Sequence, residues 1–147
     1  MLANYLTQQT VNIVDSVNDW KEAIQLCASP LLANNTISPN YIEKIFELHE
    51  SLGPYYVLAP GIAMPHARPE HGVNQLGLSM LLVKQGVNFN SADNDPVYLI
   101  TLLAAIDSSS HIEILTQLAT LFGESNDMQT IFNAQHCDQI LTVTNRY

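Results

Sequence analysis

The stretch VYLITLLAAI, residues 97–106, is a nearly unbroken apolar run that contains a single threonine. Runs of this kind are typical of a β-strand whose two faces are both buried, as in a sheet covered by helices. The run is far shorter than the roughly 20 apolar residues that cross a membrane. Residues 55–59 and 76–84 are predicted to be further strands, and residues 11–14 form a short β-branched stretch. The sequence therefore favours a sheet with residues 97–106 in its interior.

A first helix is predicted to begin at the capping box Asp19-x-x-Glu22. We expect it to continue to about Ala28, with Pro30 disturbing its end. After the apolar run, Ser110-x-x-Glu113 is another capping-box pattern and predicts a later helix. Two shorter helices are expected to finish the chain.

Between them, a further helix is predicted to begin at Ser38-Pro39, with serine as N-cap and proline at the first helical position, and to end at Gly53-Pro54. Its apolar stripe has helical spacing and consists of Ile42, Ile45, Phe46 and His49. With the strands, these helices predict an α/β sandwich in which helices cover a mixed sheet of four or five strands. The length of 147 residues fits a single domain spanning residues 1–147.

The charge of the chain is strongly acidic, with 14 acidic residues against 5 basic ones and a formal net charge of −9. Phosphate backbones are bound by basic surfaces, so this balance argues against a nucleic-acid partner. The first residues lack the basic and apolar regions of a signal peptide, and two cysteines do not make a disulfide scaffold. We therefore expect a cytoplasmic protein.

The segment GPYYVLAPGIAMPHARPE, residues 53–70, is unusual because prolines and glycines fix so much of its backbone. Pro65 and Pro69 bracket His66 and Arg68. A histidine held in a pre-formed loop has already lost its orientational entropy, and a neighbouring guanidinium can bind phosphoryl oxygens. The pattern suits a histidine nucleophile for a phosphoryl group. The alternative is a rigid turn whose histidine is merely exposed.

A second histidine, His111, falls in the first turn of the helix predicted after the apolar run. Helix N-termini attract anions and disfavour imidazolium, so we expect a neutral donor that could stabilise a phosphoryl group on His66. The alternative is a half-buried histidine at a helix start. His49 is expected to pack in the core, with a pocket-lining role left open. The spacing of His66, Glu70 and His71 does not favour a metal site.

Nucleotide-binding motifs are absent from the sequence. Residues 72–79 have the glycine spacing of a P-loop, but Leu78 stands where the lysine is needed. Any phosphoryl group would therefore come from a donor other than directly bound ATP, and no cofactor is expected.

The segment around His66, with residues 89–97 and the stretch that leads to His111, resembles the enzyme IIA components of the phosphoenolpyruvate-dependent sugar phosphotransferase system. Within the mannitol/fructose type, the pattern A-P-G-x-A-M-P-H-x-R-P-E is similar to the ascorbate branch. The resemblance implies an α/β sandwich, His66 as phosphoryl acceptor and His111 as its support. Mannitol-type members carry an arginine at the position aligned with His49, so His49 and Arg68 are further candidates for phosphoryl stabilisation.

The resemblance also implies partners. The donor would be the phosphohistidine of HPr, the acceptor a cysteine of a cognate enzyme IIB, and the membrane enzyme IIC an indirect partner. The transported sugar would be L-ascorbate or a related carbohydrate. Two alternatives stay open: a regulatory module controlled by phosphorylation of His66, and a small-molecule binding domain without catalysis. A homodimer is also left open.

Overall fold

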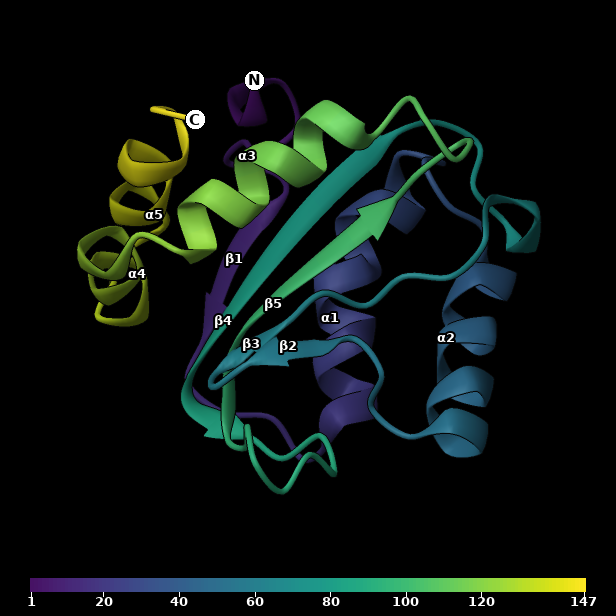
Figure 1. Cartoon of the computed structure of the whole chain (residues 1–147), viewed down its shortest axis with the longest axis horizontal. Helices are drawn as coiled ribbons and strands as arrows, with labels where there is room; N and C mark the ends of the chain where they lie inside the picture. Colours follow the sequence, from purple (N-terminus) through teal and green to yellow (C-terminus); the bar gives the residue numbers. More distant parts are fainter.

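The computed structural model describes all 147 residues, arranged around a five-stranded mixed sheet in the order β1-β4-β5-β3-β2 (Figure 1). The strands are β1 (Val11–Val14), β2 (Val57–Ala59), β3 (Ile62–Ala63), β4 (Gly77–Val87) and β5 (Val97–Ala104). β1 runs parallel to β4, and β3 runs parallel to β5, whereas the β4–β5 and β2–β3 pairs are antiparallel. The predicted α/β fold with a mixed sheet is confirmed.

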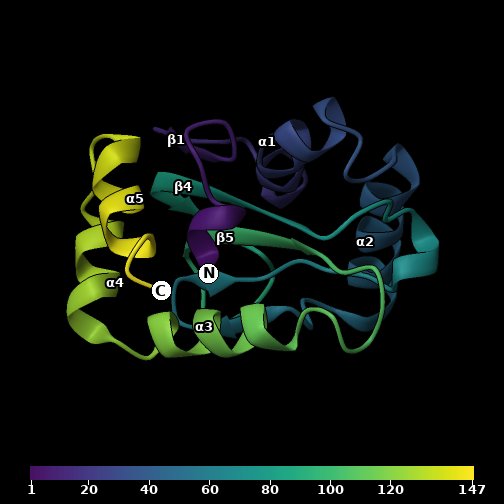
Figure 2. The same cartoon turned by 90° about the horizontal axis from the view of Figure 1, so that it is seen from above.

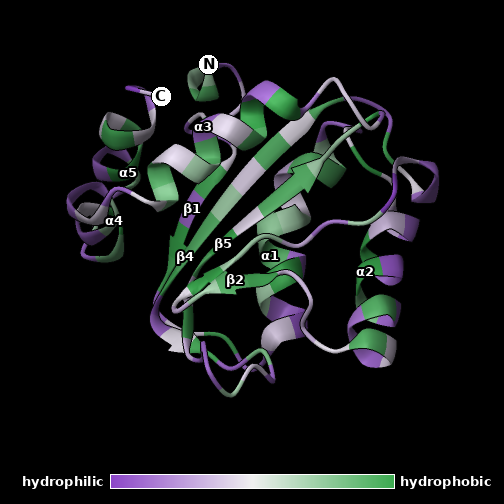
Figure 3. Ribbon diagram, viewed as in Figure 1, coloured by the Kyte–Doolittle hydropathy of each residue, from purple (hydrophilic) through white to green (hydrophobic).

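The predicted interior strand is β5, which lies between β4 and β3. Every residue of β5 is buried except Tyr98, which is partly buried. Its longest pairing is with β4, where Leu81 lies opposite Ile100 and Leu78 opposite Leu103. In Figure 3 the strands are mostly in apolar colours, whereas the helices carry both colours. Residues 97–104 of the predicted run form the interior strand, because both of its faces are covered, whereas Ile106 lies beyond the end of the strand and is exposed.

Helices cover both faces of the sheet, as the view from above shows (Figure 2). On one face lie α1 (Trp20–Ala33) and α2 (Pro39–Leu52); on the other lie α3 (Ile112–Phe122), α4 (Ser125–Phe132) and α5 (Cys137–Thr144). Short 3-10 helices occur at η1 (Leu2–Asn4) and η2 (Pro69–His71). No helix has both the length and the apolar character needed to cross a membrane.

The core consists of two apolar clusters separated by the sheet. Leu81 and Val83 of β4 belong to the cluster beneath α1 and α2. Met80 and Leu82 belong to the cluster beneath α3, α4 and α5. Because successive side chains of a strand point to opposite faces of the sheet, β4 contributes residues to both apolar clusters.

Two details of the predicted helices are wrong, and the first concerns α1. This helix does not weaken near Ala28 but continues to Ala33, with Pro30 inside it. A proline leaves the carbonyl four residues earlier without its helical partner, and here that residue is Leu26, on an exposed part of the helix that water can reach. The predicted start of α2 at Ser38-Pro39 and its end at Gly53, where φ is +82°, are confirmed.

The second detail is the capping box predicted at Ser110-x-x-Glu113, which does not form. The helix α3 begins at Ile112 with His111 as its N-cap, and no side chain caps it. The side chain of Asp107 instead accepts hydrogen bonds from the backbone N–H groups of Ser109 (2.9 Å) and Ser110 (2.6 Å). An aspartate side chain that accepts hydrogen bonds from the N–H groups two and three residues later stabilises a turn. Because Ser110 belongs to this turn, it does not cap the helix, and the helix begins later, at Ile112.

Replacing Ile100 by alanine tests the interior strand. Ile100 is fully buried in the cluster beneath α1 and α2. The Ile100→Ala substitution should lower the free energy of unfolding by about 2–5 kcal/mol, measured by urea denaturation. Leu58→Ala on β2, where the leucine is 49% exposed, should change it by less than about 0.5 kcal/mol. Equal effects of the two substitutions would contradict this packing.

Candidate functional site

A pocket of about 330 Å³ lies at the end of the sheet where β3 and β5 finish. Because these two strands run parallel, the loops that follow them emerge at the same edge of the sheet. The loop after β3 carries His66 and Arg68, and the loop after β5 leads to His111. All three residues line the pocket, so the structure brings together the residues that the sequence analysis singled out.

His66 is held with one ring nitrogen bonded to the backbone. Its Nδ1 lies 2.8 Å from the carbonyl oxygen of Met64. A carbonyl oxygen only accepts hydrogen bonds, so Nδ1 carries the proton and donates it. In that tautomer Nε2 has a free lone pair. His66 is partly buried and lines the pocket, so its Nε2 is suited to act as a nucleophile there.

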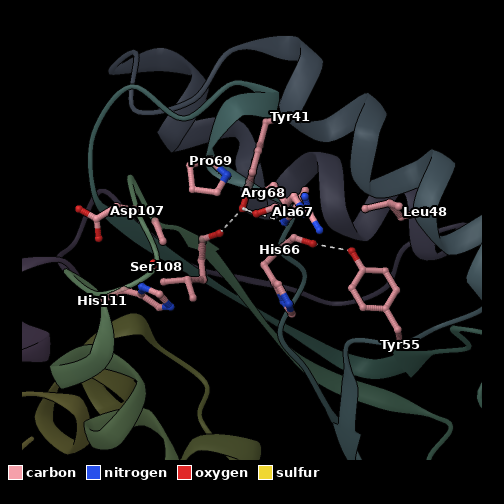
Figure 4. Close-up of a pocket in the computed structure, with 12 residues that line it drawn as sticks. Tyr41, Leu48, Tyr55, His66, Ala67, Arg68, Pro69, Asp107, Ser108 and His111 are labelled. Atoms are coloured by element: carbon pink, nitrogen blue, oxygen red, sulfur yellow. Dashed lines mark hydrogen bonds between the residues drawn. The ribbon is translucent and has the colours of Figure 1, made fainter.

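The peptide unit after His66 is bound by two tyrosines. The Tyr55 hydroxyl donates to the His66 carbonyl oxygen. The Ala67 N–H donates to the Tyr41 hydroxyl (3.0 Å), which in turn donates to the Leu103 carbonyl oxygen (2.6 Å). Figure 4 shows these bonds on the pocket wall. The loop is therefore tied to α2, to the segment before β2 and to the end of β5.

His111 lines the pocket from the loop after β5, and Figure 4 shows its imidazole to the left of that of His66. Its Nδ1 is buried without a hydrogen-bond partner, and its Nε2 makes no hydrogen bond either, while the residue lines the pocket. The ring can therefore offer Nε2 to a bound group.

One carboxylate, that of Asp107, also belongs to the lining. Hydrogen bonds from the backbone N–H groups of Ser110 and Ser109 lower the pKa of Asp107 to about 2. In Figure 4 this carboxylate points away from the two histidines. Its negative charge is thus committed to the turn before α3 and does not face a ligand between His66 and His111.

The cation of the pocket is Arg68. Its side chain is 82% exposed, and its nearest carboxylate, that of Glu70, is 3.9 Å away. An exposed pair at this distance contributes little, so the guanidinium is free to turn toward an anion in the pocket. The helix α2 adds Leu48 to the lining rather than a charged group.

His49 does not reach the pocket. It is 3% exposed and stacks on Trp20 with ring centroids 3.7 Å apart and planes 6° from parallel. Its Nδ1 lies 2.6 Å from the Tyr56 hydroxyl, and its Nε2 lies 3.2 Å from the Asn90 side-chain amide. The structure therefore supports the core-packing interpretation of His49, and its phosphoryl-stabilising role has no geometric support.

Sequence reasoning missed Tyr41, Tyr55 and Leu48 as pocket residues. Tyr41 and Leu48 occur in an amphipathic helix, where their spacing resembles ordinary core positions. Tyr55 falls at the start of the strand predicted over residues 55–59, although β2 begins only at Val57. No local pattern marks these residues, because their role depends on the loop that folds back against them. The structure contains no group of three or more histidine, cysteine or acidic side chains placed to hold a metal ion.

Fold and site together define a class: an α/β domain that presents a histidine with a free Nε2, beside a second histidine and an arginine, at one end of a mixed sheet. The family within this class follows from sequence comparison. Residues 4–147 match the family model described as "Phosphoenolpyruvate-dependent sugar phosphotransferase system, EIIA 2". The match covers nearly the whole chain, and the chain belongs to this family.

Several similar proteins support the same assignment. The mannitol-specific cryptic phosphotransferase enzyme IIA component of Escherichia coli K12 is 39% identical over 145 residues, covering 99% of this chain and 98% of that protein. The ascorbate-specific EIIA component of Salmonella typhimurium is 33% identical over 138 residues, covering 93% and 90%. The solution structure of the Escherichia coli cryptic enzyme IIA gives a TM-score of 0.91 at 38% identity, with 99% of each chain covered. The predicted resemblance is confirmed.

The buried His49 predicts a pH dependence of stability. Burial lowers the pKa of His49 below its ordinary value of 6.5. The unfolded chain therefore takes up this proton at a higher pH than the folded chain, and stability is lost as the pH falls through 6.5. The unfolding free energy of the wild type, followed by circular dichroism in urea, should be lower at pH 5.5 than at pH 7.5.

The variant His49→Phe should show a smaller difference between these two pH values than the wild type. His136→Gln, at an exposed position, serves as the control and should keep the wild-type difference. If His49→Phe and the wild type lose the same free energy between pH 7.5 and 5.5, His49 is not the group responsible.

Proposed function

We propose that this protein is a phosphocarrier in which His66 accepts a phosphoryl group from phospho-HPr and passes it to a cysteine of a cognate enzyme IIB. The observation that carries the proposal is the hydrogen bond from His66 Nδ1 to the Met64 carbonyl oxygen. This bond leaves Nε2 unprotonated, with its lone pair free, on a residue that lines the pocket. Membership of the enzyme IIA family supports a role in sugar phosphotransfer.

The first transfer replaces one nitrogen–phosphorus bond by another. The Nε2 lone pair attacks the phosphorus of the donor's phosphohistidine, and the donor imidazole leaves with the electrons of the broken bond. The Nδ1 proton of His66 stays hydrogen-bonded to the Met64 carbonyl, so the positive charge that develops on the ring is stabilised by that bond. No bound nucleotide or metal takes part in this sequence of bonds.

The second transfer reverses the roles. A thiolate of enzyme IIB attacks the phosphorus, and His66 leaves as the neutral imidazole with its proton on Nδ1. Phosphoryl transfer depends chiefly on alignment and on charge stabilisation around the phosphoryl oxygens. In this proposal His111 Nε2 and the exposed Arg68 guanidinium supply that stabilisation, and this role is supported by both residues lining the same pocket as His66. The proposed partners imply that this exchange takes place in the cytoplasm, and enzyme IIC takes part only indirectly.

Phosphoryl uptake tests these roles. After incubation with phosphoenolpyruvate, enzyme I and HPr, intact-mass spectrometry should show one added acid-labile phosphate on the wild type and none on His66→Ala. His111→Ala should take up the phosphate on the order of a hundredfold more slowly, because one stabilising donor is lost. His136→Ala, outside the pocket, should behave as the wild type. Uptake by His66→Ala, or an unchanged rate in His111→Ala, would refute the respective assignment.

The proposal also concerns which sugar the phosphotransferase system transports. We propose L-ascorbate or a related carbohydrate, because the pattern around His66 is similar to the ascorbate branch and ascorbate-specific components are among the similar proteins. The mannitol-specific cryptic component is the alternative, since it shares more identical residues. In both cases the choice of sugar is made by the membrane component, and the cognate enzyme IIB reports it.

Transfer to purified enzyme IIB proteins tests the sugar class. Phosphorylated protein should transfer its phosphate at least about tenfold faster to an ascorbate-type enzyme IIB than to a mannitol-type one, since recognition of the cognate surface lowers the barrier. Loss of label from the isolated phosphoprotein measures both rates. Faster transfer to the mannitol-type protein would contradict the ascorbate assignment and leave the phosphocarrier role intact.

A further inference from the structure

We propose that Tyr41 and Tyr55 are positioning residues that clamp the peptide unit between His66 and Ala67 and thereby aim the His66 imidazole. This inference rests on the proposed phosphocarrier function of His66. Both polar groups of that one peptide unit are bound by phenols: its carbonyl oxygen by Tyr55 and its N–H by Tyr41. A peptide unit is planar, so bonds at both of its polar atoms fix the orientation of the whole unit.

The Tyr41 side of the clamp is anchored in the core. The Tyr41 side chain is fully buried, and its hydroxyl donates to the Leu103 carbonyl at the end of β5, 2.6 Å away. With its proton committed to Leu103, the phenol oxygen accepts from the Ala67 N–H. Burial raises the pKa of the Tyr41 phenol well above its ordinary value, so the proton stays in place at neutral pH. The loop is thus tied through one hydroxyl to the central sheet.

The backbone of Tyr41 is also held in place by hydrogen bonds. Tyr41 lies in the first turn of α2, and its backbone N–H donates to the Ser38 carbonyl. The far end of the His66 loop packs against the same turn: Ser38 N–H donates to the Gly72 carbonyl at 2.8 Å. A Cβ on Gly72 would lie 2.4 Å from the Ser38 hydroxyl oxygen and 3.1 Å from the Tyr41 nitrogen. The clamp and the loop that it holds therefore share one rigid support.

The Tyr55 side of the clamp lies on the rim of the pocket, with 38% of the residue exposed. Besides binding the His66 carbonyl, the Tyr55 ring meets the His66 ring edge-on, with centroids 5.6 Å apart and planes at 80°. Figure 4 shows Tyr55 and Tyr41 approaching the loop from different sides. Together with the Nδ1 bond to Met64, these contacts leave Nε2 as the one ring nitrogen that is free to react.

Such positioning matters because phosphoryl transfer needs the attacking nitrogen in line with the bond that breaks, and a small displacement costs much of the rate. A merely structural role would have a different signature. If the hydroxyls only satisfied backbone groups, removing one would lower stability and leave both the tautomer of His66 and its transfer rate unchanged. The two roles are therefore separable by experiment.

The variants Tyr41→Phe and Tyr55→Phe remove one hydroxyl each and keep the ring. Tyr98→Phe is the matched control, because the Tyr98 hydroxyl makes no hydrogen bond to the protein and lies outside the pocket. Two quantities are measured: the single-turnover rate of transfer from phospho-HPr, with its KM, and the proportion of the Nδ1–H tautomer of His66 from long-range proton–nitrogen NMR correlations.

Each single variant should transfer about tenfold more slowly than the wild type at unchanged KM, as expected for the loss of one hydrogen bond that orients the reacting group. The Nδ1–H tautomer of His66 should also become less populated, while Tyr98→Phe matches the wild type in both measurements. Tyr55→Phe, at a partly exposed position, keeps the test available if Tyr41→Phe does not fold.

Rates within about twofold of the wild type together with an unchanged tautomer in either folded variant would overturn the clamp, because one lost hydrogen bond should cost more than that. Failure of the proposed function looks different: the wild type itself would then carry no phosphate on His66. The NMR measurement on unphosphorylated protein would still decide whether the two hydroxyls orient the ring.

Discussion

The parallel pairing of β3 with β5 is the constraint on which the site depends. It involves only two pairs of residues, Ile62 with Leu99 and Ala63 with Ile100. Yet it directs the loop that carries His66 and the loop that leads to His111 to the same edge of the sheet. The pairing is firm because β5 is buried on both faces and paired on its other side along most of β4. A strand that is buried on both faces thus sets the geometry of the pocket that holds the two histidines.

Within the pocket, fixed and mobile groups have separate tasks. Backbone groups of the His66 loop are bound to tyrosine hydroxyls, and the His66 ring is bound to a carbonyl of its own loop. Because these polar groups already have hydrogen-bond partners, rearranging the loop would break those bonds, and the loop is expected to keep its conformation. Arg68, by contrast, is exposed and only weakly paired with Glu70, so its side chain is free to move, and in the proposed function it would follow the phosphoryl group.

The sequence was sufficient to predict the buried interior strand and the loop that carries His66, because an apolar run and a proline-bracketed histidine are local patterns. The sequence was not sufficient to predict which of two adjacent helical residues lines the pocket and which packs in the core. Leu48 lines the pocket and His49 packs on Trp20, although they are adjacent in sequence, since successive helical residues point about 100° apart. The tyrosine clamp likewise depends on segments that meet only in the folded chain.

The most direct test of the central claim is to identify the phosphorylated ring nitrogen of His66 by nitrogen–phosphorus NMR of the labelled phosphoprotein. The geometry predicts phosphorus coupling at Nε2, with Nδ1 still protonated and bonded to the Met64 carbonyl. Phosphate on Nδ1 would require that bond to break, and phosphate on His111 would exchange the roles of the two histidines. Either result would contradict the role assigned to the Nε2 atom of His66.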